Sequence, residues 1–326
     1  MNIALLSDAN TPGPFHHAVN PCGWQVNGVE ALAWALDGEV WHGTEICDLA
    51  VEHFQRLDAL IVNMKHTLWN VIPALCNRLR GDVKLCDYQE GSSDILLSLD
   101  TLSLELAIRA HSALDTFCVF DQAASPFYQY CVTNVHLLQL PAPVGVYERH
   151  RVPRDGRPSD PPRVCVGQPF GAGRGAWCAT RQALVDYPGA IVVAYATDMY
   201  SMARAARWIT DAGGVPDLAG WVEWAPPIQT AIHRCAECGH QRTTTTERSH
   251  PSGSFLTRLA QCVAGYDADP RRMYGRFIVD CIGLDVDVHA DQSRTMMASD
   301  WNTALRAGWE RNHTPESIRA QFEEVV

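Results

Sequence analysis

The sequence predicts an α/β protein built from two parallel-sheet domains. Short apolar runs that suit buried strands alternate with amphipathic stretches that suit helices, an order typical of parallel βαβ units. A segment rich in proline, arginine, aspartate and glycine, 149–162, divides this series into two halves. The predicted domains are therefore residues 1–143 and 163–298, with a linker at 144–162 and C-terminal helices at 299–326.

The first half opens with a continuous apolar strand at 3–6 and an amphipathic helix at 29–36 that Gly38 ends. Further strands are expected at 40–42, 59–63, 83–88, 117–121 and 136–140, with helices at 68–80 and 101–113. Pro73 falls inside the first of these helices. It predicts a kink or a later helix start, because proline has no backbone N–H to donate.

The second half repeats the pattern, with strands at 163–167, 191–196 and 221–224 and helices at 177–187 and 199–212. An apolar run at 259–266 is expected to be a buried strand, ended by a turn at 267–270. A short helix with Phe277, Cys281 and Leu284 at helical spacing then precedes a strand in which Val286 and Val288 point the same way. In the tail, Ser299 or Asp300 caps one helix and Thr314-Pro315 starts another, which could cross back to the first domain.

Charge and composition narrow the class of protein. The chain has 326 residues, 47% of them apolar, and a net charge of −11. Residues 1–143 hold 6 Lys and Arg and 16 Asp and Glu, a net charge of −10. The remaining residues hold 20 Lys and Arg and 21 Asp and Glu, a net charge of −1. An acidic first half disfavours duplex nucleic acid as a partner. The absence of a long apolar stretch predicts no membrane span or signal peptide, and cysteines inside apolar runs predict a reducing, cytoplasmic location.

The stretch 271–288 carries a resemblance to a known family. It resembles the donor-binding segment of glycosyltransferases of the GT-B fold, in which two acidic residues separated by seven others span a Phe-Gly pair. Tyr274-Gly275 takes the Phe-Gly place and Asp280 the second acidic place, whereas Arg272 stands at the first acidic position. The Gly-x-Pro that precedes the strand in the family is replaced by Asp285-Val286-Asp287.

The resemblance implies two Rossmann-like parallel-sheet domains facing a central cleft, with a nucleotide sugar, expected to be UDP-linked, as co-substrate and no other cofactor. Asp280 would hold the ribose, and sugar contacts of the first acid do not carry over to Arg272. The helix start with Arg272, Tyr274, Gly275 and Arg276 follows a strand, where backbone N–H groups favour an anion. The glycine-rich loop after the strand at 163–167 would face the diphosphate, with Gly171, Gly173 and Arg174 as its contacts. The alternative is a flexible loop with a solvated arginine.

Candidate acceptor-side residues follow strands of the first half. His16 and His17 lie after the first strand, and the resemblance makes one of them the base that takes the acceptor proton, since a histidine pKa suits that task. The alternative is a solvated histidine pair in a proline-rich loop. Glu90 could orient the acceptor or act as base, or could be a turn residue. Asp121 could pair with a histidine and hold its tautomer.

The sharpest metal-like spacing is Cys235-x-x-Cys238. His240 and His250 could complete a tetrahedral structural zinc site, but a second Cys-x-x-Cys is missing, and free cysteines in a loop are the alternative. This threonine-rich stretch is expected to be an insertion on the second domain.

The sequence thus predicts a metal-independent glycosyltransferase that acts on a hydroxyl acceptor, either a small molecule or a modified DNA base. Arg272 slightly favours inversion of the sugar without deciding it. Two alternatives stay open: an epimerase or phosphorylase of the same fold, and a non-catalytic sugar-nucleotide-binding protein.

Overall fold

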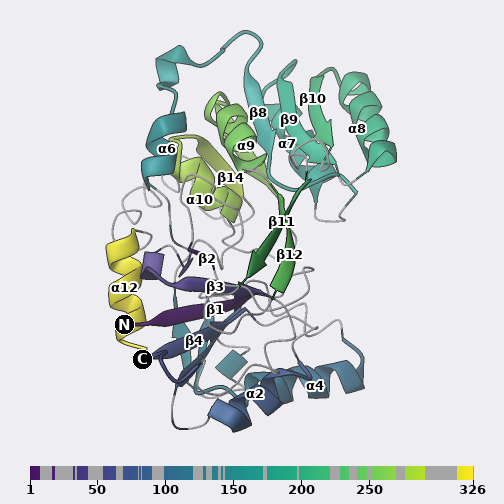
Figure 1. Cartoon of the computed structure of the whole chain (residues 1–326). Coiled ribbons are helices and arrows are strands. Elements are labelled where there is room, and N and C mark those ends of the chain that lie inside the picture. The colour runs from purple at the N-terminus through teal and green to yellow at the C-terminus, as the bar shows by residue number, and fades with distance from the viewer. Residues whose placement is uncertain are drawn as a thin grey trace.

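Two separate parallel sheets, each covered by helices, form the body of the protein (Figure 1). The structure is a computed structural model of the whole chain. It describes residues 1–7, 17–18, 32–33, 35–42, 54–63, 69–79, 81, 83–89, 99–119, 128–129, 134–138, 141, 144–171, 175–196, 198–220, 228–234, 241–247, 251–268, 276–290 and 314–325.

Within these ranges the first sheet has the strand order β2-β3-β1-β4-β5-β6-β7. Its strands are β1 (Ile3–Ser7), β2 (His17–Ala18), β3 (Glu39–His42), β4 (Ala59–Val62), β5 (Lys84–Gln89), β6 (Thr116–Val119) and β7 (Val135–Leu137). All neighbours pair in parallel except β2 and β3. Every residue of β4 and β6 is buried, as expected for central strands of a parallel sheet.

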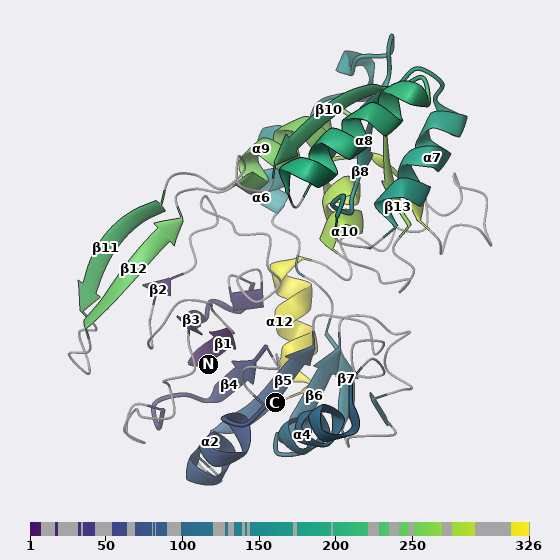
Figure 2. The ribbon, with the colours of Figure 1, turned by 90° about the vertical axis from the view of Figure 1, so that its right-hand side faces the viewer.

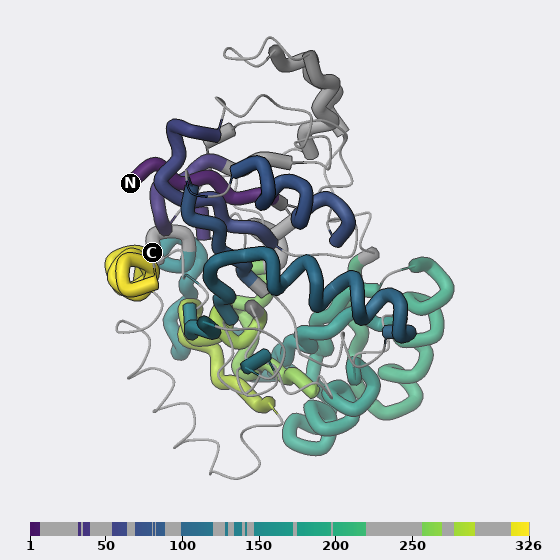
Figure 3. The backbone as a smooth tube through the Cα atoms, turned by 90° about the horizontal axis from the view of Figure 1, so that it is seen from below, coloured from purple at the N-terminus to yellow at the C-terminus, as the bar shows by residue number. Residues whose placement is uncertain are grey.

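Helices α2 (Ile72–Leu79) and α4 (Thr101–His111) cover one face of the first sheet and lie side by side (Figure 3). Pro73 takes the second position of α2, where a backbone N–H has no helical acceptor. The later helix start that Pro73 predicted is therefore confirmed. Asp100 caps α4 by accepting a hydrogen bond from the Ser103 backbone N–H at 3.0 Å.

The second sheet has the order β10-β9-β8-β13-β14, and all of its neighbours are parallel. Its strands are β8 (Arg163–Val166), β9 (Ile191–Ala196), β10 (Val215–Gly220), β13 (Ala264–Asp267) and β14 (Asp287–Ala290). Helices α7 (Ala176–Asp186) and α8 (Met199–Asp211) pack on one face, and α9 (Pro251–Ala260) and α10 (Arg276–Gly283) pack on the other.

Two predictions for the second half need correction. The run 259–266 is not one strand, because Leu259 and Ala260 end α9 and β13 begins only at Ala264. Both residues are fully buried on the helix, so a helix end and a buried strand give the same apolar pattern. The sequence also missed β10, which contains Pro216. This edge strand pairs with β9 alone and tolerates a residue that cannot donate a hydrogen bond. The predicted strand at 221–224 lies outside the described residues.

The predicted insertion contains an antiparallel hairpin of its own. Its strands are β11 (Ile228–Arg234) and β12 (Gln241–Glu247), which pair from Ile228 opposite Glu247 to Arg234 opposite Gln241. The hairpin belongs to neither large sheet and lies to one side of both of them (Figure 2).

The two remaining elements are the connection and the last helix. Residues 144–162 contain α6 (Val144–His150) and the short η5 (Arg154–Gly156). Helix α12 (Pro315–Glu323) begins as predicted, with Thr314 as its cap and Ile318 and Phe322 buried. It lies beside the first sheet, where the Arg319 Nε donates to the carbonyl oxygen of Ala35 at 2.7 Å (Figure 1). Among the helices described, none is long and apolar enough to cross a membrane.

Candidate functional site

The carboxyl ends of β8 and β13 lie side by side at the edge of the second sheet. The Gly167 N–H, directly after β8, donates to the carbonyl oxygen of Tyr266 in β13 at 3.0 Å. Open α/β sheets bind their ligands at this edge. Both segments predicted to bind the donor follow these strands in the sequence: the glycine-rich loop follows β8, and the stretch 271–288 follows β13.

Two glycines bring α10 against these strand ends. A Cβ atom built on Gly167 would lie 2.4 Å from the Phe277 ring, and one built on Gly265 would lie 2.6 Å from the Cys281 Sγ. Because real side chains do not approach so closely, only glycine permits this packing. The first turn of α10 is thereby held against the carboxyl edge of β8 and β13.

A third glycine places the start of α7 at the same edge. Gly175 precedes α7 with φ +82°, and a Cβ there would lie 2.0 Å from the carbonyl oxygen of Ala268, the residue after β13. The start of α7 therefore lies at the end of β13, and the first turn of α10 lies beside it, where Phe277 packs on Gly167 after the neighbouring β8. Helix N-termini carry free backbone N–H groups and a partial positive charge, so this edge favours an anion.

The structure also places a carboxylate there that the sequence interpretation treated only as part of a turn. Asp267 is the last residue of β13 and is 6% exposed. The Gln168 Nε2 atom, in the loop after β8, donates to its Oδ1 at 3.4 Å. A polar residue that ends an otherwise apolar strand was the available signal. A carboxylate at this position can accept hydrogen bonds from hydroxyl groups of a ligand.

Asp280 lies in the second turn of α10 and is 2% exposed. The hydroxyl of Tyr147, from α6, donates to its Oδ1 at 2.5 Å. The face of α10 that carries Asp280 thus packs on α6, while Phe277 and Cys281 face the sheet.

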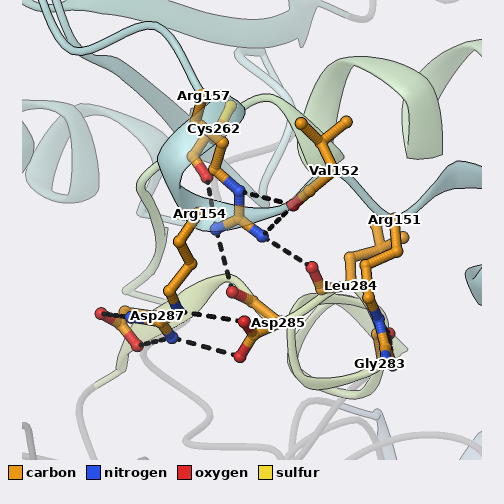
Figure 4. A network of polar contacts seen from close by, with 9 residues as sticks. All are labelled: Arg151, Val152, Arg154, Arg157, Cys262, Gly283, Leu284, Asp285 and Asp287. Atoms are coloured by element: carbon orange, nitrogen blue, oxygen red, sulfur yellow. Dashed lines mark hydrogen bonds and ion pairs between the residues drawn. The ribbon is translucent and has the colours of Figure 1, made fainter.

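Three arginines of the predicted linker hold the C-terminal end of α10 and the start of β14 (Figure 4). Arg157 is 6% exposed and donates to backbone carbonyl oxygens of Val152, Cys262, Leu284 and Asp285. Burial lowers the pKa of Arg157. Arg154 forms ion pairs with Asp285 at 3.0 Å and Asp287 at 2.8 Å, and its hydrogen bonds to these carboxylates raise its pKa. The linker is therefore packed onto the second sheet's helices.

Most of the residues predicted for the site lie outside the described residues. These are His16, Glu90, Asp121, Gly173, Arg174, Arg272, Tyr274 and Gly275, together with Cys235, Cys238, His240 and His250. His17 lies in β2, paired with Val40, and Arg276 begins α10. Gly171 has φ +96°, a conformation that favours glycine. In the part of the chain that is described, no three His, Cys, Asp or Glu side chains gather as metal ligands.

The first sheet carries a buried histidine and carboxylate pair that the sequence did not suggest. The His111 Nδ1, at the end of α4, contacts the Asp87 Oδ2 of β5, and both side chains are buried. The rings of Phe117 and Tyr128 pack against His111 with centroid distances of 5.0 and 6.3 Å. This pair lies inside the core and links α4 to the sheet.

Comparisons with known proteins identify similar folds. An α-glucosyltransferase solved with UDP and a 13-mer DNA containing an HMU base is 11% identical, with a TM-score of 0.55 over 100% of this chain and 95% of that chain. The OtsA apo structure is 8% identical, with a TM-score of 0.53 over 100% of this chain and 94% of that one. A structure described as trehalose-6-phosphate from E. coli bound with UDP-2-fluoro glucose is 9% identical, with a TM-score of 0.53 and the same coverage.

No protein-family model matches the chain, and a search of curated proteins finds no match. The first of these neighbours is described as an α-glucosyltransferase in complex with UDP, and the third was solved with UDP-2-fluoro glucose. At these identities the likeness establishes the fold alone. Together with the two parallel sheets, it confirms that the chain has the GT-B fold.

Proposed function

We propose that the chain is a glycosyltransferase that moves a sugar from a nucleotide sugar to a hydroxyl group of an acceptor. The observation that supports this most is the convergence of α7 and α10 at the carboxyl edge of β8 and β13. Two helix N-termini at one place offer N–H groups and partial positive charge to a diphosphate. The neighbours of the same fold that were solved with UDP or a UDP sugar make UDP the expected nucleotide.

The donor would lie along this edge, on the second domain of the proposed division at 163–298. The glycine-rich loop with Gly171, Gly173 and Arg174 would face the diphosphate, and so would the segment with Arg272, Tyr274, Gly275 and Arg276. Asp280 would hold the ribose hydroxyls. Asp267 is the further carboxylate at this edge and would accept hydrogen bonds from hydroxyls of the donor.

In the proposed reaction the acceptor hydroxyl oxygen attacks the anomeric carbon of the sugar. The bond from that carbon to the diphosphate oxygen breaks, and the nucleotide diphosphate leaves with the electron pair. The acceptor proton passes to a base on the first domain, His16 or His17, with Glu90 and Asp121 orienting the acceptor or the base. Arginines and helix N-termini would stabilise the leaving diphosphate, and for this reason we propose a reaction without a divalent metal.

The acceptor that we favour is an uncharged small molecule with a hydroxyl group, because the first domain carries −10 and would repel a polyanion. A modified base in DNA is the competing acceptor, since one neighbour was solved with DNA containing an HMU base. The buried thiols of Cys86, Cys118 and Cys165 favour a reducing compartment such as the cytoplasm.

Thermal unfolding with a panel of nucleotide sugars tests the donor. A donor at 100 times its Kd contributes about 2.7 kcal/mol, which would raise Tm by about 5 °C. The bound donor, radiolabelled in its sugar, is then incubated in EDTA with hydroxyl acceptors and with an oligonucleotide containing a hydroxymethylated base. The unmodified oligonucleotide serves as control.

Release or transfer of the labelled sugar in EDTA supports the proposed function. An epimerised sugar or a sugar phosphate as product would instead assign an epimerase or phosphorylase. Binding without turnover would assign a binding protein, and failure of every nucleotide sugar to bind would overturn the proposal.

A further inference from the structure

Tyr147 and Asp280 are buried partners that come from segments 133 residues apart. Tyr147 lies on α6, in the connection between the two sheets, and is 1% exposed. Its hydroxyl donates to the Asp280 Oδ1 at 2.5 Å, and Asp280 is 2% exposed. A hydrogen bond to a buried carboxylate is strong because one partner is charged and water is excluded.

The ring of Tyr147 is fixed by the next turn of α10. A Cβ atom built on Gly283 would lie 2.4 Å from the Tyr147 Cδ2, so the ring packs on the bare backbone of that glycine. Residues 280 and 283 share one face of a helix. The Arg151 Nη2 donates to the Gly283 carbonyl oxygen at 2.7 Å, which ties the backbone after α6 to the same turn. Tyr147 therefore has little freedom to move away from Asp280.

We infer that Tyr147 is a positioning residue of the donor site, which holds the Asp280 carboxylate in the orientation that binds the ribose hydroxyls. This inference rests on the proposed function. A carboxylate accepts about four hydrogen bonds, so the bond from Tyr147 is compatible with further bonds from a vicinal diol. Ordering a side chain when a ligand binds costs free energy and weakens binding. A carboxylate that is already oriented toward the diol avoids this cost.

The ligand that the Tyr147–Asp280 pair would recognise is a nucleoside diphosphate that carries both ribose hydroxyls. Its 2′,3′-dideoxy analogue keeps the base and the diphosphate and lacks the diol. If Tyr147 acts through Asp280, replacing it weakens the affinity for the nucleoside diphosphate and leaves the affinity for the dideoxy analogue unchanged. If Tyr147 only supports the fold of α10, replacing it weakens the affinity for both ligands.

The experiment measures the Kd of UDP and of 2′,3′-dideoxy-UDP by calorimetry for the wild type, Tyr147→Phe and Tyr266→Phe. Tyr266 is the matched control, because it is also 1% exposed and its hydroxyl donates to a carboxylate of the same domain, Asp186, at 2.8 Å. We expect Tyr147→Phe to bind UDP about tenfold more weakly and dideoxy-UDP as the wild type does. Tyr266→Phe should bind both ligands as the wild type does. With a sugar donor, Tyr147→Phe should raise KM by more than it lowers kcat.

Two further variants protect the test if Tyr147→Phe does not fold. Gly283→Ala keeps the hydroxyl but displaces the ring, and Asp280→Asn removes the carboxylate, so both should weaken UDP and spare dideoxy-UDP. An equal loss for the two ligands, or no loss for UDP, would overturn the inference. A wild-type protein that binds no nucleoside diphosphate would instead overturn the proposed function beneath it.

Discussion

The Arg157 Nη2 atom lies 2.9 Å from the carbonyl oxygen of Leu284, directly after the C-terminal end of α10. At this end a helix has carbonyl groups without hydrogen-bond partners and carries a partial negative charge. A buried guanidinium donates hydrogen bonds to those carbonyl groups, and its positive charge offsets the negative one. The two residues are 127 positions apart. The linker thus fixes the C-terminal end of the helix whose N-terminal end faces the proposed donor site.

Replacing Arg157 with alanine should destabilise the protein strongly. The substitution leaves the carbonyl groups of Leu284, Asp285 and Cys262 without this donor. Because a hydrogen bond with a charged partner contributes about 1.5–3 kcal/mol, we expect the free energy of unfolding to fall by about 3 kcal/mol in urea denaturation. Arg207→Ala is the control, since Arg207 is 87% exposed and its ion pair with Asp211 is 3.8 Å long. Equal effects of the two substitutions would contradict the prediction.

Gly167→Ala should disturb the donor edge as well as the core. Its Cβ would overlap the Phe277 ring, so α10 must shift away from β8. Overpacking of this kind costs about 1–3 kcal/mol, and the displaced helix start should weaken UDP binding. Gly156→Ala is the matched control, because the nearest atom to its Cβ is the Val152 Cγ1 at 3.7 Å. Urea denaturation and calorimetry check both effects, and unchanged UDP affinity in a stable Gly167→Ala protein would argue against the proposed place of the donor.

Buried thiols should resist alkylation until the protein unfolds. Burial raises the pKa of Cys86 to about 12 and raises the pKa of Cys118, Cys165 and Cys281 well above the ordinary value. At pH 8 a thiol of pKa 12 is about one part in 10,000 thiolate, and the thiolate is the reactive form.

Iodoacetamide at pH 8, followed by peptide mass spectrometry, checks this expectation. The exposed Cys178 should react in the folded protein, and Cys86, Cys165 and Cys281 should react only in urea. Rapid labelling of Cys281 in the native protein would show that α10 does not stay packed on the sheet.

Acidification should destabilise the second sheet through His289. Burial lowers the pKa of His289 below 6.5, and this outweighs the opposite effect of Asp186 and Asp287. The unfolded chain therefore binds a proton near pH 6.5 that the folded chain does not bind until lower pH, so stability falls as the pH drops below 6.5. His289→Phe should reduce this loss while keeping the ring stacked on Tyr266, whose centroid lies 4.5 Å away.

Urea denaturation between pH 7.5 and 5.5 measures the two slopes. His150, whose pKa is also lowered by burial, should leave a residual slope in the variant. Identical slopes for His289→Phe and the wild type would rule out this role of His289.

Local sequence was sufficient where an element carries its own signals. Strand β9 lies at the predicted 191–196, and α8 ends one residue before the predicted 212, because an apolar run defines the first and the Asp198 cap fixes the start of the second. The second parallel sheet and the helix start at Thr314 follow from the same kind of signal. Local sequence was not sufficient where the same pattern fits two kinds of element. At Leu259 the apolar run fits both the end of a helix and a buried strand, and the prediction of a strand there was wrong.

What the sequence determined by itself was the alternation of strands and helices, and hence the two parallel sheets, because each element depends on neighbours within a few residues. The tertiary structure alone decided that Gly167 must be glycine beneath Phe277, that Arg157 closes α10 and that Tyr147 meets Asp280. These contacts join residues more than 100 positions apart. Their existence depends on how whole helices pack, which no local pattern of residues encodes.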